Sequence, residues 1–182
     1  MIDEQIIQQC QNGDQQAFRM IVQSYQRLVF SIALRMLCDE DNAKDATQAT
    51  FIKVWQNIRS YDIRYKFQTW IYTIAVRICL DELKKSNRLD PMPEDESYFK
   101  EYADDVSPER KLENSEMVSV IKTLTNNLSP KQRMVFTLIY LENLESSEVQ
   151  QITGMTADQV KSNLSIAKKQ IKEQLKQLGY DR

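Results

Sequence analysis

The stretch from residue 144 to 169 holds the side chains whose types and spacing most strongly indicate binding to another molecule. It contains two short helical patterns joined by a turn around Gly154. Gly154 can take the positive φ with which a helix often ends, and Thr156 with Gln159 forms a capping box for the next helix. This order predicts a helix-turn-helix, whose second helix can lie in the major groove of DNA. An ordinary helical hairpin in an all-α core fits the same pattern, so both interpretations stay open here.

A second group of side chains combines flat rings with positive charges. The rings belong to Tyr61, Tyr65 and Phe67, and Arg64 and Lys66 lie between them. Such a mixture suits single-stranded nucleic acid, because rings stack on unpaired bases while cations hold phosphates. Aromatic residues at helical spacing are more often part of a core, and these residues alone favour that interpretation.

Side chains for catalysis are scarce. The chain has no histidine, which removes Ser-His and Cys-His catalysis and most zinc sites. Acids are plentiful, but none stands in a metal-ligand pattern, and no glycine-rich phosphate loop is present. We therefore expect a protein that is not an enzyme and that has no cofactor, no metal and no small-molecule substrate.

The elements that must position these residues are predicted to be helices. Of the 182 residues, 42% are hydrophobic and 27% are charged, which is enough apolar content for a globular core. Three glycines and four prolines are too few for the many turns of a β-sandwich or an α/β fold. Apolar residues recur at steps of three and four over residues 14–38, 41–58, 67–88 and 112–127. In the last of these, the side chains expected to face the core are Met117, Val120, Ile121 and Leu124.

Local signals mark two of the helix starts. Asp14 follows a glycine and is a natural N-cap for the first long helix. Ser129 and Gln132 form a capping box, with Pro130 at the first helical position.

The charges are unevenly distributed along the chain. The formal net charge is −2, but residues 89–110 hold eight acids against two basic residues and contribute −6, which leaves +4 elsewhere. This segment also holds three of the four prolines, which break helices. We therefore predict two helical domains, residues 1–88 and 112–182, joined by an extended acidic linker at residues 89–111. Such a linker lets the domains of the free protein close on each other, which the sequence leaves as a hypothesis.

The location of the protein is predicted from three features. The N-terminal residues MIDEQIIQQCQNGD are acidic and polar, unlike a signal peptide. No apolar run approaches the roughly 18 residues needed to cross a bilayer. The three cysteines are odd in number and lack a CxxC spacing, so we expect them to be reduced and buried. Together these features predict a cytoplasmic protein.

Several stretches, taken in order, resemble the extracytoplasmic-function sigma factors, the small two-domain class of the bacterial sigma-70 family. GDQQAFRMIVQSYQRLVFSIALRM and DNAKDATQATFIKVWQNI resemble the first two conserved parts of the N-terminal domain. FQTWIYTIAVRICLDELKK resembles the third, with the expected Trp70, Ile71, Tyr72 and Asp81. LSPKQRMVFTLIYLENL, SEVQQITGM and VKSNLSIAKKQIKEQL resemble the C-terminal domain. Each pattern alone is weak, but six in the right order, covering nearly all of the chain, are specific.

The resemblance implies a subunit that binds core RNA polymerase and directs it to promoter DNA. The helix over residues 41–58 would grip the clamp coiled coil of the largest polymerase subunit, through Asp45, Gln48, Phe51 and Trp55. The stretch over residues 61–88 would read and help to open the minus-10 element, through Tyr65, Lys66, Arg77, Lys84, Lys85 and Arg88. The helix that starts at Thr156 would enter the major groove of the minus-35 element, through Gln159, Lys161, Ser162, Asn163 and Ser165. Members of this class are commonly held inactive by an anti-sigma factor, so such a partner is expected.

The chain departs from the family pattern at several positions. Arg77 stands where an asparagine is usual, and Ala49 replaces a common glutamate. Glu145 stands where a serine or threonine often caps the first helix of the motif, so Ser146 is expected to cap instead. Basic or histidine side chains are common at the places of Asn163, Ser165 and Ile166. Because phosphate contacts supply much of the affinity for DNA, we expect weaker binding and an altered sequence preference at minus-35.

Two other functions stay open at the level of sequence. One is a helix-turn-helix regulator that binds duplex DNA without polymerase, which the sparse charge of the recognition helix disfavours. The other is a helical interaction protein without a nucleic-acid role, in which Lys84, Lys85 and Lys161 could be replaced without any effect on transcription.

Overall fold

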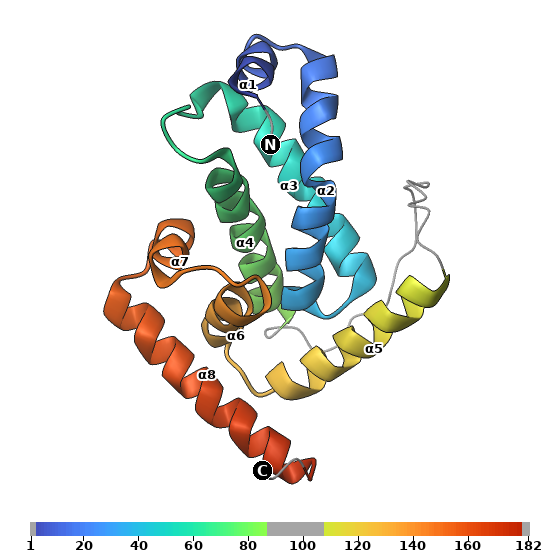
Figure 1. Cartoon of the computed structure of the whole chain (residues 1–182), viewed down its shortest axis with the longest axis vertical. Helices are drawn as coiled ribbons and strands as arrows, with labels where there is room; N and C mark the ends of the chain where they lie inside the picture. The colour runs from blue at the N-terminus through green and yellow to red at the C-terminus, as the bar shows by residue number, and fades with distance from the viewer. Residues whose placement is uncertain (1–2, 87–107, 180–182) are drawn as a thin grey trace.

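The computed structural model describes residues 3–86 and 108–179, with side chains for 3–85 and 116–179. Within these ranges every regular element is a helix, which confirms the predicted all-α fold (Figure 1). The elements are α1 (Glu4–Gln11), α2 (Gln15–Leu37), α3 (Glu40–Asn57), η1 (Ile58–Ser60), α4 (Phe67–Ser86), α5 (Pro108–Thr125), α6 (Pro130–Phe136), the π-helical turn η2 (Thr137–Leu141), α7 (Ser146–Thr153) and α8 (Ala157–Gln177). Across the same ranges, no helix combines the length and the apolar character needed to cross a membrane.

Capping side chains start several helices where the sequence predicts them. Asp14 accepts a hydrogen bond of 2.7 Å from the backbone of the first turn of α2. Ser129 and Gln132 form the predicted capping box of α6, and Thr156 and Gln159 form that of α8. Each cap satisfies amides that the first turn of a helix leaves unpaired.

Two local features differ from what the sequence suggested. The helix α1 was not anticipated, because its short polar sequence buries only Ile7 and Cys10. At α7 the N-cap is Glu145 and not Ser146, so that prediction was wrong. The backbone N–H of Glu145 donates to the Glu148 carboxylate at 3.1 Å, and this return bond stabilises the helix start without a serine.

The N-terminal domain packs α1, α3 and α4 against the long central helix α2 (Figure 1). Ile21, Ile32 and Met36 of α2 are fully buried, as are Val54 of α3 and Ile71 of α4. Burial of a side chain of this size stabilises the fold by about 1.5–3 kcal/mol relative to exposure.

The C-terminal domain contains the predicted helix-turn-helix. The helix α7 ends at Gly154, which has a left-handed φ of 71°. Val149 and Ile152 of α7 are buried together with Val160 of α8, so these apolar side chains lie on the inner faces of the two helices. The turn therefore fixes the direction in which α8 leaves α7.

The helix α5 presents a different face to the core from the one expected. Ile121 is buried as predicted, but Met117 and Val120 are exposed. The buried side also includes Thr125, whose hydroxyl donates to the Ile121 carbonyl at 2.7 Å, and Val118 packs on the core. Periodicity alone could not separate these two neighbouring stripes, because a threonine on the buried one looks polar.

The two domains lie against each other. The helices α6 and α7 pack on α4, and η2 packs on α2 (Figure 1). Buried side chains form one continuous apolar cluster across this boundary, for example from Tyr72 and Val76 of α4 to Met134 and Val149. The two domains are thus packed against each other, a closed arrangement that the sequence left as a hypothesis.

Candidate functional site

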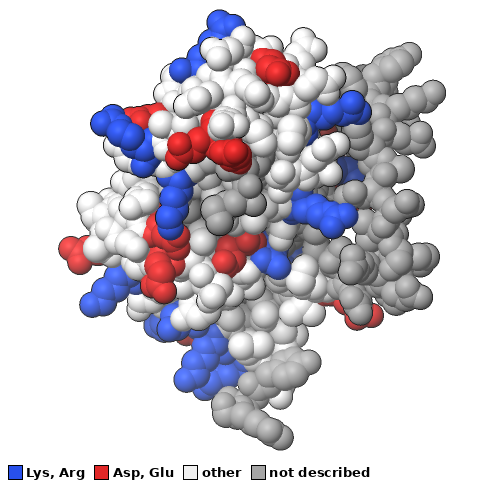
Figure 2. Space-filling model, turned by 45° about the horizontal axis from the view of Figure 1, so that its top comes forward, with Lys and Arg blue, Asp and Glu red and all other residues white. Residues whose placement is uncertain are grey.

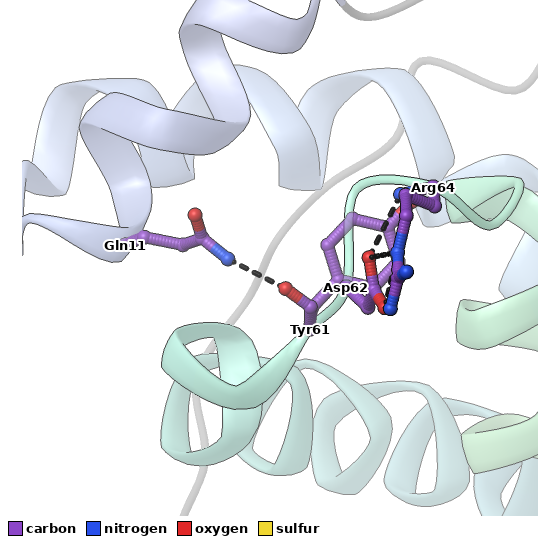
Figure 3. A network of polar contacts seen from close by, with 4 residues as sticks. All are labelled: Gln11, Tyr61, Asp62 and Arg64. Carbon is purple, nitrogen blue, oxygen red and sulfur yellow. Dashed lines mark hydrogen bonds and ion pairs between the residues drawn. The ribbon is translucent and has the colours of Figure 1, made fainter.

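The loop between η1 and α4 is held in place by polar contacts (Figure 3). Gln11 of α1 donates from its amide to the Tyr61 carbonyl at 2.8 Å. Within the loop, Arg64 donates from Nε to the Asp62 carboxylate at 2.9 Å, and this guanidinium lowers the pKa of Asp62 to about 2. These contacts restrain the backbone from Tyr61 to Arg64, directly before the exposed Tyr65.

Tyr65 is the ring that this loop presents to solvent. Its exposed fraction is 68%, and Lys66 beside it is also exposed. Tyr61 and Phe67, by contrast, are buried with ring centres 5.0 Å apart, and Trp70 lies 5.0 Å from Tyr61. The core interpretation therefore holds for Tyr61 and Phe67, while Tyr65 and Lys66 can meet a nucleic acid.

The other residues expected at minus-10 lie farther along α4. Arg77 is exposed near the middle of the helix, and Lys84 and Lys85 are exposed at its end. Lys66 and Lys84 are about 27 Å apart along the axis, because a helix rises 1.5 Å per residue. Lys66, Arg77 and Lys84 also share one side, since steps of eleven and seven residues complete whole turns. They therefore form a row and not a cluster, and Arg88 lies outside the described residues.

The two lysines at the end of α4 pair with acids of the preceding turn. Lys84 lies 3.1 Å from the Asp81 carboxylate, and Lys85 lies 2.7 Å from that of Glu82. Exposed pairs of this kind contribute about 0–1 kcal/mol, so a phosphate could replace either acid at little cost.

Two of the residues expected at minus-35 are engaged within α8. Gln159 accepts from the Thr156 backbone at 3.0 Å as part of the capping box. Asn163 donates from its amide to the Gln159 carbonyl at 2.8 Å. A bidentate contact with adenine uses both the oxygen and the nitrogen of an amide, so such a contact would compete with these bonds.

The remaining residues expected at minus-35, Lys161, Ser162 and Ser165, are exposed on the first turns of α8. Residues 157–167 contain one cation, Lys161, and one anion, Asp158, and so carry no net charge. Figure 2 shows that basic side chains on the face in view lie among acidic ones and form no continuous basic surface. Sequence reading or shape, more than charge, must therefore supply any DNA preference of this helix.

The helix α3 exposes a separate face that mixes polar and apolar side chains. Asp45 and Gln48 are exposed, and Trp55 is 36% exposed while its ring packs 4.8 Å from that of Phe18. Ile52, which is 51% exposed, lies between them at helical spacing. Sequence reasoning missed Ile52, although its place three and four residues from Trp55 and Gln48 was a usable signal.

Phe51 does not belong to this face. It is only 7% exposed and packs in the core, because it lies one residue away from the exposed stripe. The structure thus brings three of the four expected residues together and separates the fourth from them.

The cysteines are buried and unsuited to chemistry. Burial raises the pKa of Cys10 to about 11 and that of Cys79 to about 12, so both thiols stay protonated at neutral pH. Among the side chains that the structure describes, no group of cysteines and acids is placed to hold a metal ion.

Comparisons with known proteins match both halves of the chain. A family model described as Sigma-70 region 2 matches residues 21–89, and one described as Sigma-70, region 4 matches residues 120–171. The ECF RNA polymerase sigma factor SigW of Bacillus subtilis is 31% identical, over 98% of this chain and 99% of its own length. The RNA polymerase sigma-H factor of Pseudomonas aeruginosa is 27% identical, over 97% and 95%.

Two solved structures share the fold. CnrH, in complex with the cytosolic domain of CnrY, has a TM-score of 0.68 at 17% identity and covers 94% of this chain and 95% of its own. The sigma factor RpoE of Bartonella quintana, in complex with the anti-sigma factor NepR, has a TM-score of 0.58 at 21% identity and covers 87% and 96%. At these identities the likeness concerns the fold alone.

Proposed function

Because the chain belongs to the extracytoplasmic-function sigma factors of the sigma-70 family, we propose that it binds core RNA polymerase and directs it to promoters with minus-10 and minus-35 elements. One observation carries this proposal. The chain has three separate exposed surfaces, which follow one another along the sequence: the face of α3, the row that starts at Tyr65, and the first turns of α8. We assign them to polymerase, to the minus-10 element and to the minus-35 element, respectively.

The face of α3 is the proposed polymerase contact. Trp55 and Ile52 offer apolar area, and Asp45 and Gln48 offer hydrogen bonds beside it. Interfaces commonly have such an apolar centre with polar groups around it. Phe51 supports this face from inside the core and makes no direct contact in our proposal.

The row along α4 is the proposed minus-10 surface. Tyr65 would stack on an unpaired base, an interaction worth about 1–3 kcal/mol. Lys66, Arg77, Lys84 and Lys85 would hold phosphates of the same strand, and the weak pairs of the last two lysines would exchange for them. Arg88, which lies outside the described residues, is proposed from the sequence alone as a further phosphate contact.

The first turns of α8 are the proposed minus-35 surface. Lys161 would hold a phosphate or a guanine, and Ser162 and Ser165 would contact bases or phosphates. To contact adenine, the side-chain amides of Gln159 and Asn163 would have to share or give up the hydrogen bonds that they make within α8. We therefore propose modest affinity and a sequence preference that depends on the polymerase holding this helix in place.

The proposal includes the cell compartment, the lack of catalysis and one further partner. A specificity subunit of RNA polymerase has no catalytic step of its own, and it acts in the cytoplasm, where bacterial transcription takes place. Proteins of the same fold have been solved with CnrY and with NepR, so we propose that an anti-sigma factor also binds this chain.

Transcription with purified core polymerase tests the proposed function. We expect a stable complex and defined start sites on a promoter library, with shared sequences near minus-10 and minus-35. Gln48→Ala should weaken the complex, whereas Asn57→Ala, an exposed position on the opposite side of α3, should not. A chain that forms no complex with polymerase, or that binds duplex promoters equally well without it, would contradict the proposal.

A further inference from the structure

A cavity of about 260 Å³ opens on the surface of the N-terminal domain, where the turn between α1 and α2 meets the end of α3 and η1. The residues that line it are Cys10, Gly13, Trp55, Gln56, Ile58 and Arg59. Pockets that enclose small-molecule ligands usually measure about 300–1,000 Å³. The cavity is smaller than these and is bordered by exposed side chains, so its size fits one side chain of a partner protein better than a free ligand.

Both walls of the cavity are held by contacts within the domain. From α1, the amide of Gln11 donates to the Ile58 carbonyl at 3.0 Å and to the Tyr61 carbonyl at 2.8 Å, and Figure 3 shows the second of these bonds. On the other wall, the ring of Trp55 packs 4.8 Å from that of Phe18. The helix α1, which the sequence did not predict, thus serves to complete this cavity.

Arg59 supplies a positive charge at the cavity. Its side chain is exposed, and its Nη2 lies 3.8 Å from the position that a Cβ on Gly13 would take. In the part of the chain that the structure describes, no acid pairs with it. Asp14, the residue after Gly13, accepts instead from two backbone N–H groups in the first turn of α2, at 2.7 Å and 3.2 Å. The guanidinium is therefore available to a carboxylate, which it can hold through two parallel hydrogen bonds.

The cavity also continues the proposed polymerase-binding face of α3. Exposed residues follow one another at steps of three, four, three and four residues, namely Asp45, Gln48, Ile52, Trp55 and Arg59. This is the spacing of the seam along which one helix of a coiled coil packs on another. We call these five residues the α3 seam, which spans about 21 Å at 1.5 Å per residue. It has an acid at one end, apolar side chains near its middle and a cation at the other end.

We propose that the cavity beside Trp55 receives an acidic side chain of core RNA polymerase, bound by Arg59, and that this contact sets the direction of a polymerase helix along the α3 seam. Such a helix carries a cation opposite Asp45, about 14 residues, or two heptads, from its acid. The reversed helix would set its cation against Arg59 and its acid against Asp45, which like charges disfavour. This inference rests on the proposed function and adds to it a specificity-determining residue, Arg59, and the chemistry of its partner.

The affinity of the full-length chain for core polymerase is the first test. Arg59→Glu should weaken the complex about tenfold, whereas Arg59→Lys, which keeps the charge, should weaken it less. Lys172→Glu is the matched control, because it makes the same change of charge at an exposed position of α8 and should bind as the wild type does. Both positions are exposed, so all three variants should keep the Tm of the wild type. Equal affinities of Arg59→Glu and Lys172→Glu would overturn the role of Arg59.

Cross-linking of the complex is the second test, and it identifies the partner side chain. A carbodiimide joins a lysine amine to a carboxylate in contact with it, forming an amide bond with loss of water, and it does not join an arginine. Arg59→Lys should therefore link position 59 to an aspartate or glutamate of polymerase, whereas the wild type should give no link there. Mass spectrometry should place that acid on a helix with a lysine or arginine about 14 residues away. Replacing that acid by arginine in polymerase should restore the binding of Arg59→Glu.

The two tests separate this inference from the proposed function. Arg59→Lys that binds polymerase but links to none of its acids would overturn the cavity contact. If the wild type still directs polymerase to defined start sites in that case, the proposed function stands without the contact. A wild-type protein that forms no complex with core polymerase would remove both.

Discussion

Replacing Gly154 by alanine should destabilise the protein by about 1 kcal/mol through backbone conformation alone. Gly154 has φ 71° and ψ 12°, and a Cβ built on it would meet no atom within 4 Å. The left-handed conformation costs an L-residue roughly 1–2 kcal/mol. Alanine recovers about 0.4–1 kcal/mol of this by restricting the unfolded chain, which leaves a net loss near 1 kcal/mol.

Thermal unfolding followed by circular dichroism measures this loss. The apolar core runs continuously from α1 to α8, so we expect one cooperative transition. For a chain of this size, 1 kcal/mol corresponds to a Tm lowered by about 2–4 °C. Asparagine tolerates the left-handed region, so Gly154→Asn should lower Tm by less than half as much.

Gly179 provides a matched control for the same reasoning. It also has a left-handed φ, of 83°, and open space around its Cα, but it lies at the end of α8 where the chain can relax. Gly179→Ala should therefore change Tm very little. If Gly154→Ala were as stable as the wild type, the turn would not depend on left-handed backbone, and our account of how α8 is directed would be refuted.

Three further predictions concern the proposed surfaces and the domain contact. Phe51→Ala should lower the stability by about 3–5 kcal/mol, whereas Gln48→Ala should leave Tm unchanged and weaken only the polymerase complex in a pull-down assay. In the closed state burial raises the pKa of the Glu142 carboxyl more than Arg35 lowers it. The closed state therefore binds a proton at Glu142 more tightly than the open state does. The closed state should then become more stable as the pH falls from the raised pKa of Glu142 towards the ordinary pKa of a glutamate. Small-angle scattering that shows the domains opening on mild acidification would contradict this prediction. Lys161→Ala should weaken minus-35 binding by the holoenzyme evenly across sequences and reduce its salt slope by about one, while Gln159→Ala should change the preferred sequence in a selection from random DNA.

The caps and the turn of the helix-turn-helix could be predicted because they depend on neighbouring residues. Each capping box, Ser129 with Gln132 and Thr156 with Gln159, forms between residues three positions apart. Such a box can therefore be recognised from the local sequence alone. The α5 stripe was predicted wrongly for a related reason. Periodicity shows that a helix has an apolar face, but the helices that it packs against decide which face is buried, and they are distant in sequence. In α5 the buried face includes Thr125, whereas Val120 is exposed.

The candidate surfaces could be predicted only in part. Residue types and spacing alone favoured a core position for the aromatic residues, and only the family resemblance singled out Tyr65 and the cations of α4. Neither could separate the exposed Tyr65 from Tyr61 and Phe67, which pack in an aromatic cluster. Phe51 and Ile52 are adjacent in sequence and have opposite fates, because α3 turns one towards α2 and α4 and the other towards solvent. Domain closure depends on contacts about a hundred residues apart, such as that of Arg35 with Glu142, for which the sequence carries no local signal.

The weak charge of the recognition helix and the closed arrangement together favour an ordered pathway. Residues 157–167 have no net charge, so phosphate contacts there cannot supply much free energy for opening the domains. DNA alone would have to break the buried contact of Arg35 with Glu142 and separate apolar surface that is continuous across the domains. Polymerase can contribute through the face of α3, which closure leaves exposed. Glu142→Arg sets a second cation against Arg35 and should open the domains, whereas Glu173→Arg makes the same substitution at an exposed position of α8 and serves as its control. Glu142→Arg should therefore bind polymerase as tightly as Glu173→Arg does, or more tightly, and gain mainly in DNA binding without polymerase. A loss of polymerase affinity on opening, measured by competition against the wild type, would show that closure helps polymerase binding and would refute this order.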